Sequence, residues 1–63
     1  MPSSFLEQLV QAEAVKWAES LVARSPRLAA QILIGRETAN TQYFSPLFRA
    51  RLNALDALIA AGR

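Results

Sequence analysis

The 63-residue sequence contains neither cysteine nor histidine. Without cysteine the chain can form no disulfide and offers no thiolate to a metal. Without histidine it lacks the commonest side-chain ligand of transition metals, and it cannot build a Ser-His or Cys-His nucleophilic pair. The absence of cysteine also fits a reducing compartment. We therefore expect no metal, no cofactor and a cytoplasmic location.

Glycine is scarce as well, with Gly35 and Gly62 the only two in the chain, so no glycine-rich loop can hold a phosphate. Three of the five acidic residues, Glu7, Glu13 and Glu19, follow one another at intervals of six. On a helix that interval rotates successive side chains by about 120°, so they do not converge as an acid–base pair. We therefore predict that the protein is not an enzyme.

Long apolar runs are missing too. The longest, residues 28–34, spans seven residues and includes Gln31, whereas a membrane-spanning helix needs about 20 apolar residues. The first residues carry no basic charge and no uninterrupted apolar stretch, so we expect no targeting signal. The sequence predicts no membrane partner.

The chain is rich in apolar residues, which make up 52% of the sequence. A chain of this length forms a single domain, residues 1–63, and buries only about 60% of the surface that its unfolded form exposes. Small domains of this kind depend on disulfides, metals or self-association. Because the composition removes the first two, we expect a homo-oligomer.

Two Ser-Pro pairs divide the chain, and this dipeptide favours a helix start because serine caps and proline fits the first turn. The sequence predicts an all-α, compact three-helix unit with helices at about 4–24, 26–34 and 46–61. Gly35 and Gly62 are the expected stops of the last two. In the second helix apolar residues point in several directions, more than two neighbours can cover. This excess is our main reason for expecting a homodimer.

The first predicted helix carries one apolar stripe, formed by Leu6, Val10, Ala14, Trp17 and Leu21. We expect Trp17 to belong to the core. Phe5 and Leu9 lie off this stripe, toward the polar side of the helix. Two apolar side chains on the same edge near a helix start indicate a second contact surface.

The third predicted helix has an apolar arc of Leu47, Phe48, Leu52, Leu55, Leu58 and Ile59. A strip of small residues, Ala50, Ala54, Ala57 and Ala61, lies beside it and lets a second helix approach closely. Arg51 falls inside the arc. Its stem can lie over apolar neighbours while its head reaches water, or its head can pair with an acid, and we favour a pair with Glu37 or with a second subunit. In a third interpretation Arg51, Arg36 and Tyr43 bind an acidic partner.

Charge is distributed unevenly along the chain. Residues 1–23 hold three glutamates against one lysine, for −2, and residues 24–63 hold six arginines against two acids, for +4. This asymmetry can steer an anionic partner or can pair the two halves with each other. We favour internal pairing.

Together these features predict a non-enzymatic protein–protein interaction module, a small adaptor, regulator or inhibitor that docks on a larger protein. Such a composition is typical of small regulators from bacteria or their phages. The partner-binding residues that we predict are Arg36, Tyr43, Phe44, Arg51, Phe5 and Leu9.

The alternative is a nucleic-acid-binding regulator whose phosphate contacts come from Arg24, Arg27, Arg36, Arg49 and Arg51. The order of the second and third helices resembles a helix-turn-helix motif. However, the connector at 35–44 is about ten residues long, against three or four in that motif. The third helix also begins with Leu47 and Phe48, where polar base-reading side chains are expected. Nucleic acid is therefore the less favoured partner.

Overall fold

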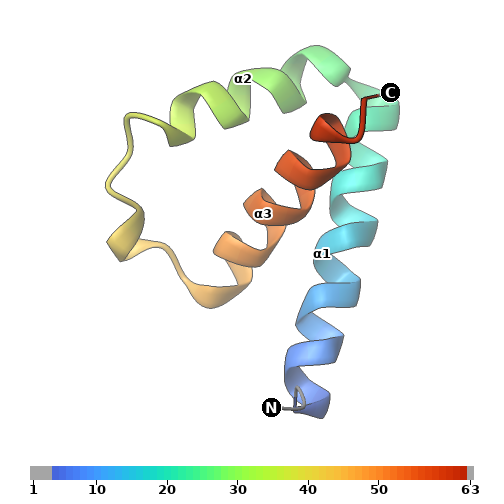
Figure 1. Ribbon diagram of the computed structural model, residues 1–63, viewed down its shortest axis with the longest axis vertical. Coiled ribbons are helices and arrows are strands. Elements are labelled where there is room, and N and C mark those ends of the chain that lie inside the picture. The colour runs from blue at the N-terminus through green and yellow to red at the C-terminus, as the bar shows by residue number, and fades with distance from the viewer. Residues whose placement is uncertain (1–3, 63) are drawn as a thin grey trace.

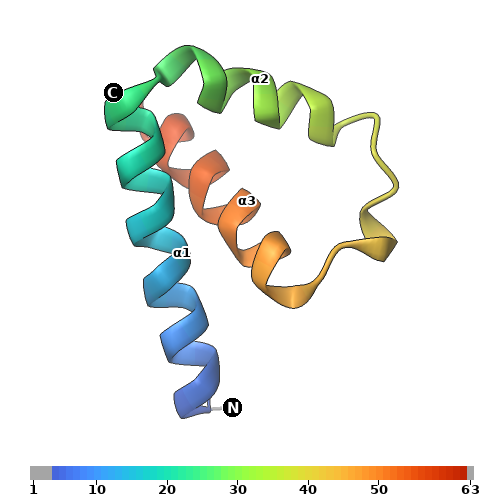
Figure 2. The same cartoon turned by 180° about the vertical axis from the view of Figure 1, so that it is seen from behind.

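A computed structural model of the protein describes residues 4–62. In that part of the chain it contains three α-helices and one turn of 3-10 helix: α1 (Phe5–Arg24), α2 (Pro26–Arg36), η1 (Thr41–Tyr43) and α3 (Pro46–Ala60). The predicted all-α, three-helix architecture is confirmed there. α2 crosses the C-terminal end of α1, and α3 runs beside α1 in the same direction (Figure 1, Figure 2).

The three helix starts follow the predicted serine caps. Ser4 Oγ accepts a hydrogen bond from the backbone N–H of Glu7, and the Glu7 carboxylate accepts one from the backbone N–H of Ser4, which completes a capping box. Ser25 and Ser45 each accept a hydrogen bond from the backbone N–H three residues further on. Each is followed by a proline at the first helical position, where a missing N–H costs no hydrogen bond.

The helix ends confirm one predicted glycine stop and overturn the other. Gly62 has a φ of +84°, the left-handed conformation typical of a helix stop, and α3 ends at Ala60, close to the predicted position. Gly35 lies inside α2, which continues to Arg36. The backbone N–H groups of residues 37–39 donate to carbonyls three residues back. These tight turns satisfy the last carbonyls of α2 without a left-handed residue, so no glycine stop is needed.

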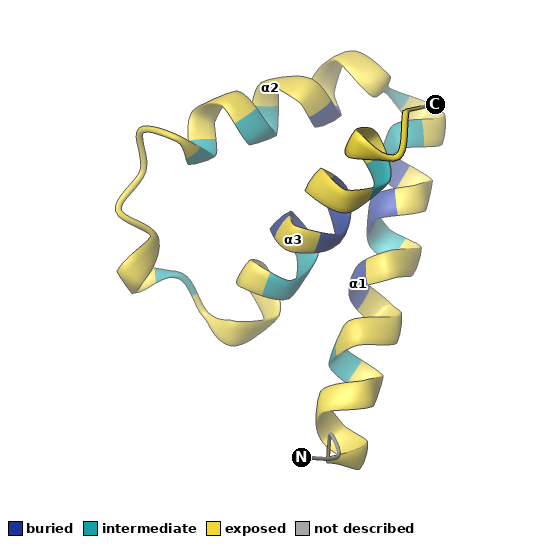
Figure 3. Ribbon diagram, in the orientation of Figure 1, coloured by how far each residue is buried: buried dark blue, intermediate teal, exposed yellow. Residues whose placement is uncertain are grey.

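The core lies where α3 packs against the C-terminal half of α1, with α2 closing one side (Figure 3). The buried side chains are all apolar: Ala14, Ala18, Leu21, Ala29, Leu52, Ala54 and Leu55. Four of these seven are alanines, which bring the helix axes close together but bury little area each. Leu55 is the only large side chain among the described residues that is fully buried. Trp17 is half-buried at the edge of this core.

Candidate interaction surfaces

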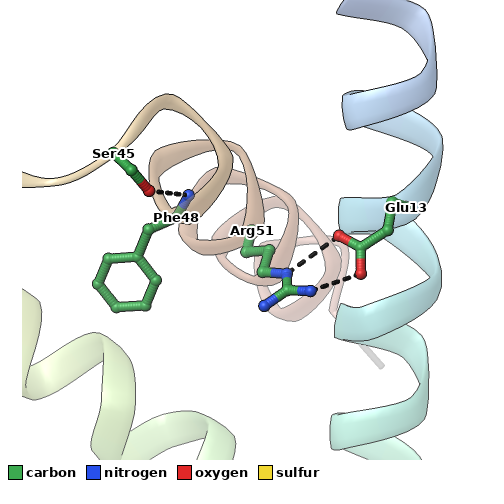
Figure 4. Close-up of polar contacts among 4 residues, drawn as sticks. All are labelled: Glu13, Ser45, Phe48 and Arg51. Carbon is green, nitrogen blue, oxygen red and sulfur yellow. Dashed lines mark hydrogen bonds and ion pairs between the residues drawn. The ribbon is translucent and has the colours of Figure 1, made fainter.

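Arg51 links α3 to α1 through a bidentate ion pair with Glu13. Its Nε donates to Glu13 Oε1 at 3.0 Å and its Nη2 donates to Glu13 Oε2 at 2.6 Å (Figure 4). The guanidinium carbon also lies 5.6 Å from the centroid of the Trp17 ring, a cation–π distance. The predicted ion pair at Arg51 is therefore confirmed, but the residue that pairs with Arg51 is Glu13. The prediction of Glu37 as the partner was wrong.

The Arg51 guanidinium, through its hydrogen bonds, lowers the pKa of the Glu13 carboxyl from its usual value. Glu13 in turn raises the pKa of Arg51. The two side chains keep 47% and 30% of their surface exposed, so water screens the charges. The pair therefore sets how α1 and α3 face each other more than it adds stability. It also joins an acid of residues 1–23 to an arginine of residues 24–63, as the charge asymmetry predicted.

A second arginine, Arg49, ties the connector to α3. Its Nη2 donates to the backbone carbonyl oxygens of Thr41 and Gln42, at 3.1 and 3.4 Å. Only one nitrogen of the guanidinium makes these bonds. Its other donors make no hydrogen bond to the described residues, and they are available to an acceptor outside the chain.

Two further contacts position the connector. Phe44 packs edge-on against Phe48, with ring centroids 4.8 Å apart and planes at 71°. Phe44 immediately precedes the cap of α3 and contacts the first turn of that helix, which fixes the direction in which the connector enters α3. Arg36, the last residue of α2, donates from Nη2 to Asp56 on α3 at 3.3 Å. The connector is thus held at both ends.

These contacts frame a cavity of about 560 Å³ between α2, the connector and α3, lined by Arg36, Thr41, Gln42, Phe44, Arg49, Leu52 and Asn53. Two of the predicted partner-binding residues, Arg36 and Phe44, line it. A third, Tyr43, belongs to η1 beside it and is 79% exposed. We call Arg36, Tyr43, Phe44 and Arg49 the connector face. Arg49 was not among the partner-binding residues predicted from the sequence, because its hydrogen bonds to the connector depend on how the chain folds back.

The other predicted residues lie elsewhere. Arg51 is engaged with α1, and Phe5 and Leu9 lie in the first turns of α1, which extend beyond the start of α3 (Figure 1). Phe5 is 74% exposed, Leu6 69% and Leu9 50%. Leu6 was expected in the buried stripe, and the structure corrects this expectation. α1 and α3 diverge toward their N-terminal ends, so nothing among the described residues covers Leu6.

A cleft of about 330 Å³ separates the diverging ends and is lined by Leu6, Glu7, Val10, Gln11 and Pro46. Leu47, in the first turn of α3, is 39% exposed. We call the apolar side chains at the diverging ends of α1 and α3 the open end: Phe5, Leu6, Leu9, Val10, Pro46 and Leu47.

No family model, curated protein or solved structure matches the chain. Residues 4–62 contain no group of three acidic, histidine or cysteine side chains that could hold a metal ion. Within the same residues no helix has both the length and the apolar character needed to cross a membrane.

Proposed function

We propose that the protein is a non-enzymatic protein–protein interaction module that forms a homodimer and docks, as a small adaptor, regulator or inhibitor, on a larger protein. The amount of surface that the chain leaves uncovered carries this proposal. The accessible surface is 4864 Å², whereas a close-packed monomer of 6.9 kDa exposes about 4000 Å². The excess, roughly 900 Å², is about what one partner contributes to a standard interface.

The shape of the chain also supports this proposal. Its radius of gyration is 12.0 Å, against about 10–11 Å for a compact domain of this length. Its principal extents are 34 × 26 × 17 Å, so the three helices form a thin layer. A thin layer buries few side chains on its own and presents two broad faces to partners.

The connector face has the composition of a docking site for a different protein. Tyrosine, phenylalanine and arginine are enriched in interfaces, and tyrosine and arginine also at their energetically dominant positions. Tyr43 is 79% exposed, and Phe44 and Arg49 line an adjoining cavity. The hydrogen bonds of Arg49 to the connector hold this face in place before a partner binds, which lowers the entropic cost of docking.

Affinity capture with paired variants tests the docking function. We expect the tagged wild-type chain to retain a specific protein from extracts of its native host, and Tyr43→Ala to lose it. Because the Tyr43 side chain is almost free of the fold, this change should leave the far-UV circular dichroism intact. Gln31→Ala, an exposed change on α2, is the matched control and should retain the same protein. Retention by Tyr43→Ala, or no specific protein at all, would contradict docking through this face.

The nucleic-acid alternative makes a different prediction in the same experiment. In the structure Arg36 and Arg51 are ion-paired within the chain, so fewer arginines are free for phosphates, which favours the docking proposal. Binding to duplex DNA weakens by about 0.9 log units per log unit of salt for each phosphate contact. Nucleic acid in the eluate, released steeply by salt, would support the alternative.

A further inference from the structure

We propose that the connector face binds an acidic segment of the partner protein, with a carboxylate held by Arg36 and Arg49 and an apolar side chain in the cavity beside them. The inference rests on the docking function proposed above and adds the chemistry of the partner. From the sequence, Arg36, Arg51 and Tyr43 were candidates for binding an acidic partner. The structure engages Arg51 with α1 and places Arg49 at this face instead.

Charge distinguishes the cavity of the connector face from other cavities of the chain. Its seven lining residues include two arginines, Arg36 and Arg49, and no acid; Glu37, the acid of the connector, does not line it. Three other cavities in residues 4–62 are each lined by one glutamate and by no basic residue. The connector also lies on the side of the molecule away from α1, which carries three of the five acidic residues (Figure 1, Figure 2). The connector face is therefore suited to an anionic ligand.

Both guanidinium groups keep hydrogen-bond donors for a ligand. Arg36 uses only its Nη2, which donates to Asp56, and Arg49 uses only its Nη2, which donates to two connector carbonyls. In each arginine, Nε and Nη1 make no hydrogen bond to the described residues. Because the bonded nitrogen already holds each side chain in place, a ligand does not have to immobilise two flexible arginines.

The local charge matches a carboxylate better than a phosphate. Asp56 offsets the charge of one of the two arginines, so the three side chains together carry a single positive charge. A carboxylate carries one negative charge, whereas a phosphorylated side chain at neutral pH carries about 1.5 to 2. A carboxylate therefore neutralises the site, while a phosphate would leave surplus negative charge beside Asp56.

A second cavity, of about 260 Å³, adjoins the first and shares Arg36, Phe44 and Leu52 with it. The four other residues that line it carry no charge: Ile32, Gly35, Ala39 and Phe48. This cavity fits an apolar side chain of the partner next to the carboxylate. The backbone of a nucleic acid offers no such side chain, so the pair of cavities favours a protein.

Gly35 provides an independent observation at the second cavity. It lies inside α2, where glycine is less favourable than alanine or leucine. A Cβ added at Gly35 would meet nothing within 4 Å, so no contact within the described chain requires a glycine there. A residue without a side chain does allow a ligand to approach the backbone of the helix closely.

Two peptides of equal length test the chemistry of the partner. The probe is a short acetylated and amidated peptide with two glutamates beside two leucines, and its control has glutamine in place of each glutamate. In NMR titrations of the isotope-labelled chain, we expect the glutamate peptide to shift the Nε–H signals of Arg36 and Arg49. It should bind at least about 10-fold more tightly than the control, because hydrogen bonds to a charged acceptor are the stronger ones. Equal binding of the two peptides, or shifts confined to other residues, would overturn the inference.

Variants that lose the same charge show where the peptide binds. Arg49→Gln removes a positive charge from the connector face, and Arg27→Gln removes one from an exposed position at the other end of α2. We expect Arg49→Gln to weaken binding of the glutamate peptide at least about 10-fold and Arg27→Gln by less than about twofold. Equal losses would show a general attraction to the positive chain and would overturn the site.

Gly35→Leu tests the second cavity without touching the hydrogen bonds of the connector. It should melt no lower than the wild type, because leucine favours a helix and the added Cβ meets no neighbour. We expect it to weaken binding of the glutamate peptide at least about fivefold, since its side chain would compete with the leucine of the peptide. Unchanged binding would overturn the assignment of the second cavity.

Further titrations separate this inference from the docking function. Inorganic phosphate or a short DNA duplex that binds at the same site more tightly than the glutamate peptide would overturn a carboxylate partner. A protein that the wild type captures and Tyr43→Ala loses, without any preference for the glutamate peptide, would leave docking in place and overturn this inference. Preference for the glutamate peptide without a captured protein would support the chemistry of the site and contradict docking.

Discussion

The two ends of the α1–α3 pair use the same helices and similar residue types, yet one end is closed and the other open. At the closed end Ala14, Ala18, Leu21, Ala54 and Leu55 are buried. At the open end Phe5, Leu6, Leu9 and Leu47 are exposed by 39% or more. The closed end combines three alanines with two leucines, whereas every residue just named at the open end is large. Apolar content alone therefore does not decide which part of a helix is buried; side-chain size at the crossing does.

The physical reason is the distance between helix axes. Alanines let two helices approach closely, so the leucines beside them reach across and are covered. Large side chains keep axes apart, and at the open end the helices diverge until neither covers the other. Arg51 marks the transition, because its ion pair with Glu13 spans the two helices just before they separate.

The largest expected effect comes from placing a charge at a buried position of α3, on the side that faces α2 and the connector. Leu52 is 2% exposed, so Leu52→Asp buries an unpaired carboxylate. That cost is several kcal/mol, comparable to the whole stability of a small domain, about 3–9 kcal/mol for this length. We expect an unfolded chain by circular dichroism. Leu47→Asp, on the same helix at the open end, should remain helical. A wild-type melting curve for Leu52→Asp would mean that α3 is not packed as described.

The second prediction compares the enlargement of a buried alanine with that of an exposed alanine on the same helix. Ala14 is fully buried between α1 and α3, so Ala14→Leu forces the helices apart and should cost about 1–3 kcal/mol. Ala12 is exposed two residues earlier on α1, and Ala12→Leu should change the free energy of unfolding by no more than about 0.5 kcal/mol. Urea denaturation measures both. Equal effects would show that close helix approach does not hold the closed end together.

A smaller effect is expected at the boundary of the two ends. Arg51→Lys keeps the charge but loses the planar fork that contacts both oxygens of Glu13. We expect a melting temperature slightly below that of the wild type and a smaller loss than for Ala14→Leu. Arg27→Lys, at an exposed position on α2, is the control and should melt as the wild type does. If Arg51→Lys also leaves stability and dimer mass unchanged, the ion pair does not set the pairing of the helices.

The smallest effect is a dependence on pH. The folded pKa of Glu13 lies below its usual value of 4.5, so the ion pair stabilises the fold fully above about that pH. The contribution is lost as the pH falls through the lower folded pKa, because protonation removes the charge. Wild type and Glu13→Gln should therefore differ in melting temperature at neutral pH and converge in acid, and added salt should shrink the difference. A difference that persists at the lowest pH would show that Glu13 contributes through packing instead of charge.

Sequence signals that act within a few residues account for the features that were predicted correctly. Serine caps and the prolines after them act within one turn, so the three helix starts were predicted to within a residue. The apolar periodicity of α3 correctly identified Leu52 and Leu55 as core residues. The position of Phe5 and Leu9 off the main stripe indicated a second surface, and the structure leaves both side chains exposed.

The Gly35 stop failed for a local reason, because the tight turns after α2 made it unnecessary. The other predictions that failed depended on contacts between distant residues. Glu37 was favoured as the partner of Arg51 because it is the acid of the connector, but the parallel packing of α1 and α3 places Glu13 there instead. Leu6 has the helical phase of a core residue, and only the divergence of the helices leaves it exposed. Arg49 joined the candidate site because the connector folds back over α3.

The composition of the surfaces and the positions of the helices that carry them follow from residues close together in the chain, since capping, helical phase and charge act over a few residues. The tertiary structure decided which apolar side chains are covered and which ion pairs form, because both depend on where α1 and α3 cross. Alanines set that crossing near one end of the pair, and the geometry of two rods that meet at one end leaves the other end apart. The surface that remains uncovered at the open end is a consequence of that crossing.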